Sequence, residues 1–314
     1  MTAHWMRRTT LALACAAATL LSACGSSSIE SALAPERLVA FGDGYSSLGA
    51  QRYTVNNGSI NNWTLQLLEY YRGAGHAAGG LVSLAEGNAR LQQQPDAAGQ
   101  ASTRTVAQQI DGFLASQRLG ANDVALVNGG VSDIIVDMAA VQAGRLSPEQ
   151  FLQQARQHGE ALAAQVRRLV AGGANYVAVS NLYDLGLTPW AAAINQKDLL
   201  SQASNQFNRG LLVALNDLSQ NVLYIDVAYY VNLYTSNPES FSFYNTTEPV
   251  CTSVDAGNGI GIGLGQINSS LCTAATLRPN AEADRYVFAD AVYLAPSAQR
   301  QLGLYAYDKL RARW

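Results

Sequence analysis

Short apolar runs alternate with longer amphipathic segments along most of the chain. Runs that are apolar at consecutive positions are typical of parallel strands covered by helices on both faces, and they predict strands at residues 38–41, 124–127, 176–180 and 222–227. Strands that alternate with helices indicate a doubly wound α/β fold. We therefore expect a three-layer αβα sandwich around a parallel five-stranded sheet of the flavodoxin-like kind.

Helix boundaries can also be predicted from the residues that punctuate the pattern. Ser147 is a suitable N-cap, Pro148 suits the first turn, and Gln150 completes a capping box three residues after the cap. The helix that begins there is expected to end at the Gly172-Gly173 pair, because glycine commonly follows the last helical turn. Two further helices are predicted at residues 198–218 and 296–309.

Residues 238–279 interrupt the alternation and are expected to form a long excursion from the domain. Cys251 and Cys272 flank a segment of this excursion that is rich in Gly, Ser and Asn. In an oxidising compartment these two cysteines are expected to form a disulfide, which would contribute about 3 kcal/mol by loop-closure entropy. A metal site is the alternative, but no histidine or further cysteine accompanies the pair.

The first residues have the pattern of a secretion signal. Arg7 and Arg8 precede an apolar stretch at residues 11–21, which is too short to span a bilayer. The stretch ends in Leu-Ser-Ala-Cys, which resembles a bacterial lipobox with Cys24 as the lipidated residue. An ordinary signal peptide that ends near a cysteine is the alternative.

This resemblance implies a division of the chain into three parts. Residues 1–23 would be a removed signal peptide, residues 24–36 a lipidated cysteine with a flexible tether, and residues 37–314 a single domain. Gly25, in place of an aspartate after the cysteine, implies sorting to the outer membrane. We expect a protein of the bacterial envelope whose contact with the membrane is its N-terminal lipid.

Composition narrows the classes of function. Of the 314 residues, 48% are hydrophobic and 14% charged, so the chain can bury a large core. The formal net charge is −3, and it becomes −5 without residues 1–23, which hold two arginines and no acidic residue. This balance excludes a basic nucleic-acid-binding surface. No zinc motif or phosphate-binding loop occurs, so no metal or cofactor is expected.

The chain has only three histidines, His4, His76 and His158, and none follows residue 158, so none lies near the C-terminus. His4 belongs to the predicted signal peptide. His76 lies in a glycine-rich segment that predicts an exposed loop. His158 lies among Gln and Arg in a predicted helix, which indicates a solvated face. A mechanism that needs a histidine near the C-terminus is therefore excluded.

Candidate chemistry lies where the predicted strands end, because ligands of open α/β sheets bind beyond the carboxyl ends of the strands. The segments of interest read Phe-Gly-Asp-Gly-Tyr-Ser-Ser-Leu-Gly at 41–49, Ala-Glu-Gly-Asn-Ala-Arg at 85–90, Asn-Gly-Gly-Val-Ser-Asp at 128–133 and Phe-Ala-Asp-Ala-Val-Tyr-Leu-Ala-Pro at 288–296. These four blocks, in this order, resemble those of the GDSL, or SGNH, esterases and lipases. The resemblance covers most of residues 37–311.

The resemblance implies a role for five positions, and three of them carry another residue. In that family a serine after Gly-Asp is the nucleophile, and Gly44 stands in its place. A glycine and an asparagine build the oxyanion hole; Gly87 fits the first, and Ser132 stands in place of the second. The last block supplies the acid and the base; Asp290 fits the acid, and Tyr293 stands in place of the histidine.

These substitutions predict a catalytically weak or inactive pseudo-esterase. Glycine offers no nucleophile, and tyrosine, with an ordinary pKa near 10, is a poor proton acceptor at neutral pH. A change of one oxyanion-hole donor alone can cost about 3 kcal/mol of transition-state stabilisation. The sequence Gly-Ala-Asn-Asp at 120–123 resembles the third block, but it precedes a strand, so Asn122 would lie at the wrong end of the sheet.

Two other functions remain open at this point. The chain can be a non-enzymatic envelope protein that uses the old cleft to bind an acyl chain, a lipid or a glycan, or that contacts a protein partner. Alternatively, it can be an active hydrolase with Ser46 as a displaced nucleophile, which would need an adjacent base.

Overall fold

The computed structural model describes residues 33–76 and 78–314, so the predicted signal peptide, Cys24 and most of the tether lie outside the described residues. Five parallel strands form the central sheet in the order β2-β1-β3-β4-β5. They are β1 (Leu38–Phe41), β2 (Leu81–Ser83), β3 (Val124–Val127), β4 (Tyr176–Ser180) and β5 (Val222–Ile225). This is the flavodoxin-like strand order, and it confirms the predicted fold class.

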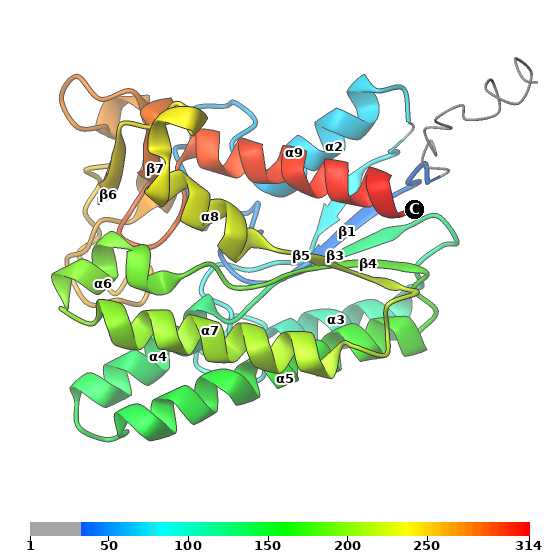
Figure 1. The fold of residues 1–314 in the computed structure, drawn as a ribbon, viewed down its shortest axis with the longest axis horizontal. Helices are drawn as coiled ribbons and strands as arrows, with labels where there is room; N and C mark the ends of the chain where they lie inside the picture. The colour runs from blue at the N-terminus through cyan, green and yellow to red at the C-terminus, as the bar shows by residue number, and fades with distance from the viewer. Residues whose placement is uncertain (1–32, 77) are drawn as a thin grey trace, which may run out of the picture.

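Helices cover both faces of the sheet, which completes the three layers (Figure 1). One layer contains α3 (Val106–Ser116), α4 (Val131–Gln142), α5 (Pro148–Ala171) and α7 (Lys197–Ala214). The other contains α2 (Trp63–Gly73), α8 (Val227–Ser236) and α9 (Pro296–Arg313). All side chains of β1 and β3 are buried, because helices lie on both sides of these strands.

Local sequence signals account for most of the element boundaries. Helix α5 begins with the predicted capping box, in which the Ser147 hydroxyl accepts from the Gln150 N–H and the Gln150 side chain accepts from the Ser147 N–H. The strand predicted at residues 222–227 ends at Ile225 as β5, because the Asp226 carboxylate accepts a hydrogen bond from the Tyr229 N–H and starts α8. The last helix runs to Arg313, four residues further than predicted.

The excursion at 238–279 lies beyond the carboxyl end of the sheet, beside the short helix α6 (Pro189–Ala193) (Figure 1). It contains β6 (Asn245–Pro249), which pairs in parallel with β7 (Tyr286–Phe288) in a second, two-stranded sheet that the hydrophobic pattern did not indicate. Its other elements are short 3-10 helices at Pro238–Phe241, Ser269–Leu271 and Ala274–Thr276; further single turns of this kind occur at Leu185–Leu187 and Ala283–Arg285. Cys251 and Cys272 are joined by a disulfide.

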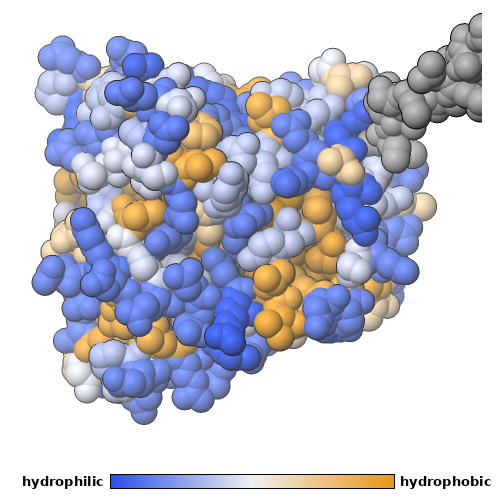
Figure 2. All heavy atoms as spheres, viewed as in Figure 1, coloured by the Kyte–Doolittle hydropathy of each residue, from blue (hydrophilic) through white to orange (hydrophobic). Residues whose placement is uncertain are grey.

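The surface of the domain is mixed in polarity. On the face shown in Figure 2, apolar residues form separate patches among hydrophilic ones. Among residues 33–76 and 78–314, no helix combines the length and apolarity that crossing a membrane requires.

Candidate functional site

The turn that follows β1 is held in place by side chains from neighbouring elements. The buried Gln109 side chain of α3 bonds both backbone groups of Gly42: it accepts from the N–H at 2.8 Å and donates to the carbonyl at 2.9 Å. The Asn128 amide, which follows β3, leaves no room for a Cβ atom at Gly42, because such an atom would lie 1.9 Å from Oδ1. The strand exits of β1 and β3 therefore lie in direct contact.

Asp43 is the acidic residue of this turn, and its side chain is fully buried. Its Oδ1 accepts from the Asn128 side-chain amide at 2.6 Å and from the Tyr45 N–H at 3.1 Å, whereas its Oδ2 has no hydrogen-bond partner among the described residues. Burial raises the pKa of Asp43 to about 6, against the opposing effect of these hydrogen bonds. Through its hydrogen bonds with Asn128 and Tyr45, the carboxylate fixes the conformation of the turn.

Two tyrosine side chains occupy the space beside Gly44. A Cβ atom at Gly44 would lie 2.4 Å from Cδ2 of Tyr53 and 2.8 Å from the hydroxyl oxygen of Tyr293. The two rings are stacked, with centroids 4.4 Å apart and planes at 19°, and both are buried. Neither hydroxyl group has a hydrogen-bond partner among the described residues. The position expected for a nucleophile is thus buried under an aromatic pair.

The two positions expected for the oxyanion hole are buried as well. Gly87 lies under the side chain of Gln51, whose Cβ would be 2.3 Å from a Cβ atom added at Gly87. Ser132 lies in the first turn of α4, and its side chain is completely inaccessible to solvent. The Ser132 hydroxyl has no hydrogen-bond partner among the described residues. In this conformation neither position faces solvent.

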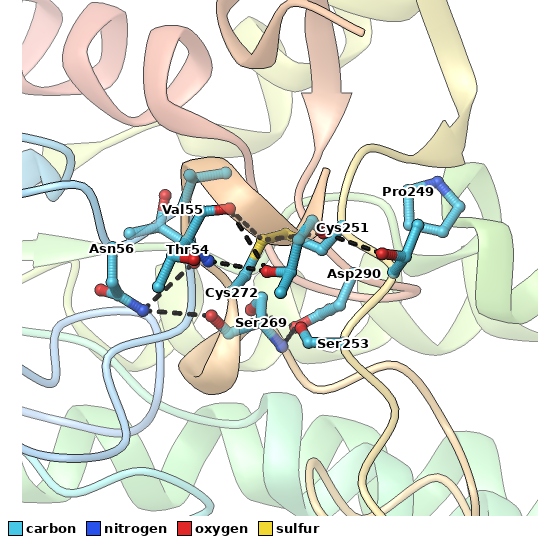
Figure 3. Close-up of a disulfide and its surroundings, with 12 residues drawn as sticks. Thr54, Val55, Asn56, Pro249, Cys251, Ser253, Ser269, Cys272 and Asp290 are labelled. Carbon is cyan, nitrogen blue, oxygen red and sulfur yellow. Dashed lines mark hydrogen bonds between the residues drawn. A yellow bond between two sulfur atoms is a disulfide. The ribbon is translucent and has the colours of Figure 1, made fainter. Parts of the chain in front are cut away.

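Asp290 follows β7, and its buried carboxylate lies beside Ser269 of the excursion (Figure 3). Oδ1 accepts from the N–H groups of Val292 and Tyr293 at 2.8 and 2.7 Å. Oδ2 accepts from the hydroxyl and the N–H of Ser269. Burial raises the pKa of Asp290 to about 6, although these hydrogen bonds act in the opposite direction. The side chain that meets Asp290 is therefore a serine from the excursion.

The disulfide-linked part of the excursion also holds the segment that carries Tyr53 (Figure 3). The Asn56 N–H donates to the Cys272 carbonyl at 2.8 Å, and the Asn56 side-chain amide donates to the carbonyls of Ser269 and Ser270 at 3.1 and 3.2 Å. The excursion thus contacts Asp290 on one side and the Tyr53 segment on the other.

Ser46, the candidate displaced nucleophile, is buried and contacts no base. Its hydroxyl oxygen accepts a hydrogen bond from the Trp63 indole N–H at 3.0 Å, and its N–H donates to the Asp43 carbonyl. These contacts match a role in packing the turn against α2.

The two histidines that the structure describes, His76 and His158, lie away from the expected base position. His76 follows α2 and precedes β2, so it lies near the amino ends of the strands. The prediction that His158 lies on a solvated face is wrong: its side chain is only 16% exposed, and its Nε2 lies 2.8 Å from Oδ2 of Asp137. Helix α5 packs against α4, which turns this side of α5 inward.

His158 belongs to a buried charge cluster that joins the second and third blocks. The Asp133 carboxylate lies 3.4 Å from Nε of Arg90 and 3.8 Å from Nδ1 of His158, and it accepts from the Leu91 N–H at 3.0 Å. Burial alone would lower the pKa of His158, but the hydrogen bond with Asp137 and the nearby carboxylate charges raise it. Asp133 therefore connects α4, α5 and the segment that follows Gly87.

The Gly-Ala-Asn-Asp sequence at 120–123 lies at the amino end of β3, as expected from its position before the strand. Asn122 accepts a hydrogen bond from the Glu36 N–H through its carbonyl, and Asp123 forms an ion pair with Arg37 at 2.6 Å. These contacts are structural and are separated from the site by the length of the sheet.

The structure thus brings the five block positions to one edge of the sheet, and it adds residues that sequence reasoning missed. Tyr53, Gln51 and Ser269 cover Gly44, Gly87 and Asp290 respectively, and none of the three stands in a recognisable motif.

Among the described residues, no three His, Cys, Asp or Glu side chains gather in a way that could hold a metal ion.

Comparison with solved structures finds the native aryl esterase of M. smegmatis, with a TM-score of 0.48 and 12% identity over 89% of this chain and 100% of that one. Among curated proteins, Esterase EstA of Pseudomonas aeruginosa and of Pseudomonas putida are each 29% identical over 216 residues. These alignments cover 67% of this chain but only 30% of each esterase, so the chain spans less than a third of the length of these relatives.

The profile of the GDSL-like Lipase/Acylhydrolase family matches residues 38–304, from the first strand into the last helix. The match therefore includes all four blocks. Because it spans most of the chain, this protein belongs to the GDSL-like lipase/acylhydrolase family.

Proposed function

We propose that this chain is a catalytically weak or inactive pseudo-esterase that serves as a binding protein of the bacterial envelope. One observation carries the proposal: the space beside Gly44, where a nucleophilic side chain would lie, is filled by the Tyr53 and Tyr293 rings. A vacant site would admit substrate and permit residual turnover, whereas a packed one excludes the ester itself.

The chemistry of the remaining groups supports the same proposal. Acyl transfer needs a nucleophile within reach of a base. Burial raises the pKa of Tyr293 well above its ordinary value, so this side chain stays protonated and cannot accept a proton. Both carboxylate oxygens of Asp290 already accept hydrogen bonds from Ser269 and from backbone N–H groups, so neither is available to orient an imidazole. These residues stabilise the fold and do not form a triad.

An active hydrolase that uses Ser46 is the competing candidate, and its local contacts disfavour it. The hydroxyl is buried under Trp63, and the residues that bond it include no base. The ligand of the proposed binding function must also lie outside the family's catalytic positions, because Tyr53 and Gln51 cover them. An acyl chain, a lipid or a glycan would therefore bind at a different surface.

Hydrolysis of p-nitrophenyl acetate and p-nitrophenyl butyrate tests the proposal, with EstA of P. aeruginosa as the positive control. We expect no appreciable turnover by the purified chain. Turnover that is lost in Ser46→Ala, while the circular dichroism spectrum is unchanged, would overturn the proposal and establish the displaced nucleophile.

Restoration of the family residues tests the role of Tyr53. The triple variant Gly44→Ser, Ser132→Asn, Tyr293→His is expected to remain inactive, because the Tyr53 ring still occupies the nucleophile's space. Addition of Tyr53→Ala to this variant is expected to produce measurable esterase activity. Full activity of the triple variant with Tyr53 present would show that the ring does not block the site.

Anchoring through Cys24 is the second part of the proposal, and it rests on the sequence pattern at residues 7–25. Metabolic labelling with a palmitate analogue is expected to label the chain and to fail in Cys24→Ala. Fractionation of the labelled cells is expected to place the protein with the outer membrane. Labelling of Cys24→Ala at the level of the unaltered chain would contradict lipidation at this residue.

A further inference from the structure

A groove of about 600 Å³ lies between α4 and the glycine-rich segment 257–265 of the excursion. Its apolar lining includes Val136 and Ala139 of α4, Trp190 of α6 and Ile262 of the excursion. None of the five block positions lines it. The volume falls within the range of about 300–1,000 Å³ that is usual for sites of small ligands.

The wall formed by the excursion is held firmly against the domain. Gly261 lies so close to Ala97 that a Cβ atom there would be 2.7 Å from the alanine Cβ, and its φ of +88° also favours glycine. The Asn88 side-chain amide donates to the Gly259 carbonyl at 2.8 Å. The Asn258 side chain accepts from the Gly263 N–H at 3.0 Å. These contacts give the groove a preformed shape.

The charged groups that line the groove differ in their availability. The Asp96 carboxylate is buried and accepts hydrogen bonds from the Gln100 N–H at 2.7 Å and from the Thr103 hydroxyl at 2.6 Å. Arg145 is exposed, and its guanidinium has no hydrogen bond or ion pair with any other described residue. The groove thus combines an apolar wall with an available cation, which is complementary to an anionic headgroup on an apolar chain.

We propose that this groove binds a single-chain anionic amphiphile, with its carboxylate on Arg145 and its alkyl chain along Val136, Ala139 and Ile262. This inference rests on the proposed binding function and names the class of its ligand. No bond is made or broken, because the groove contains neither Gly44 nor Asp290. The binding site is therefore separate from the positions that carry out hydrolysis in the family.

Decanoate, decanol and decyltrimethylammonium serve as probes that share an alkyl chain and differ in head charge. Binding of each is measured by equilibrium dialysis with the full chain in phosphatidylcholine nanodiscs, with empty nanodiscs subtracted. We expect decanoate to bind more tightly than decanol, and decyltrimethylammonium to bind most weakly. Absence of decanoate binding, or equal binding of the anion and the cation, would overturn the proposal.

Three variants locate the ligand. Arg145→Ala is expected to weaken decanoate binding about tenfold, the loss of a charge-assisted contact, and to leave decanol binding unchanged. Val136→Glu, which adds a carboxylate at a half-buried position of the wall, is expected to abolish binding of both. Arg209→Ala removes an exposed arginine of α7 outside the groove and is the matched control. Unchanged decanoate affinity in Arg145→Ala or Val136→Glu would contradict the assignment.

Failure of the predicted decanoate binding can be distinguished from failure of the proposed pseudo-esterase function. Esterase activity in a chain that binds decanoate as predicted would overturn the absence of catalysis and leave the groove in place. Absence of both activity and decanoate binding would leave the filled catalytic position in place and reject this ligand.

Discussion

The rings of Tyr53 and Tyr293 stack with their centroids 4.4 Å apart, directly over the backbone of Gly44. In the proposed assignment Tyr293 stands at the position of the family's histidine and Gly44 at that of its serine, while Tyr53 comes from a loop outside the four blocks. The three residues are sterically interdependent, because a side chain at position 44 would collide with the Tyr53 ring. The glycine at position 44 is therefore part of a packed arrangement with the two tyrosine rings.

Gly44→Ser is expected to destabilise the protein by about 1–3 kcal/mol, the usual cost of overpacking a buried site. The added Cβ would lie 2.4 Å from the Tyr53 ring, so the ring or the turn must shift. Urea denaturation followed by circular dichroism gives the free energy of unfolding. In a Tyr53→Ala background the same substitution should cost much less, and equal costs in both backgrounds would contradict the steric interdependence.

Asp43→Asn is expected to reduce the pH dependence of stability between about pH 4 and pH 6. The folded-state pKa of Asp43 is raised from 3.8 to about 6, so the folded state holds this proton more tightly than the unfolded state does. Stability from this group is fully present below pH 3.8 and is lost as the pH rises through 6, by up to about 3 kcal/mol at about 1.36 kcal/mol per pKa unit.

The asparagine in this variant keeps an oxygen for the Tyr45 N–H and the Asn128 amide, and it carries no charge. The free energy of unfolding of Asp43→Asn relative to the unaltered protein should therefore rise from pH 4 to pH 7. A constant difference across this range would show that Asp43 titrates normally.

His158→Gln is expected to destabilise the protein more at pH 6 than at pH 8. The pKa of His158 is raised above 6.5 in the folded state, so the protonated imidazole contributes stability that is fully present below pH 6.5 and lost as the pH rises through the folded-state pKa. The groups that face it are Asp133, Asp137 and Arg90. NMR titration of the imidazole gives the pKa of His158 directly, and a value below 6.5 would contradict the predicted increase in that pKa.

Ser269→Ala is expected to cost about 1.5–3 kcal/mol, because it removes a hydroxyl that donates to the buried Asp290 carboxylate. Ser253→Ala is the matched control within the same excursion, since its hydroxyl donates to the uncharged Asn268 carbonyl at 3.0 Å and should cost about 1 kcal/mol. Thermal unfolding compares the two variants. Loss of the Ser269 hydroxyl should also raise the pKa of Asp290 further, because this hydrogen bond lowers it. Equal destabilisation by Ser269→Ala and Ser253→Ala would argue against a charged carboxylate as the acceptor of the Ser269 hydroxyl.

The sequence by itself determined the features that depend on near neighbours along the chain. Consecutive apolar residues predicted β1, β3 and β4 at their observed positions, because a strand buried on both faces needs no polar residue. The capping box at Ser147 placed the start of α5 correctly. The order of the four blocks indicated the family. Their positions after predicted strands also indicated that Gly44, Gly87 and Asp290 would lie at one edge of the sheet.

Contacts between distant segments could be decided only by the tertiary structure. Tyr53 covers Gly44 from a loop, and it stacks on Tyr293 from the far end of the chain; no periodic pattern marks such a contact in advance. His158 was predicted on a solvated face, because its neighbours in sequence are polar, but the packing of α5 on α4 buries it. Burial and hydrogen-bond partners depend on what packs against a residue, and the sequence around that residue does not contain this information.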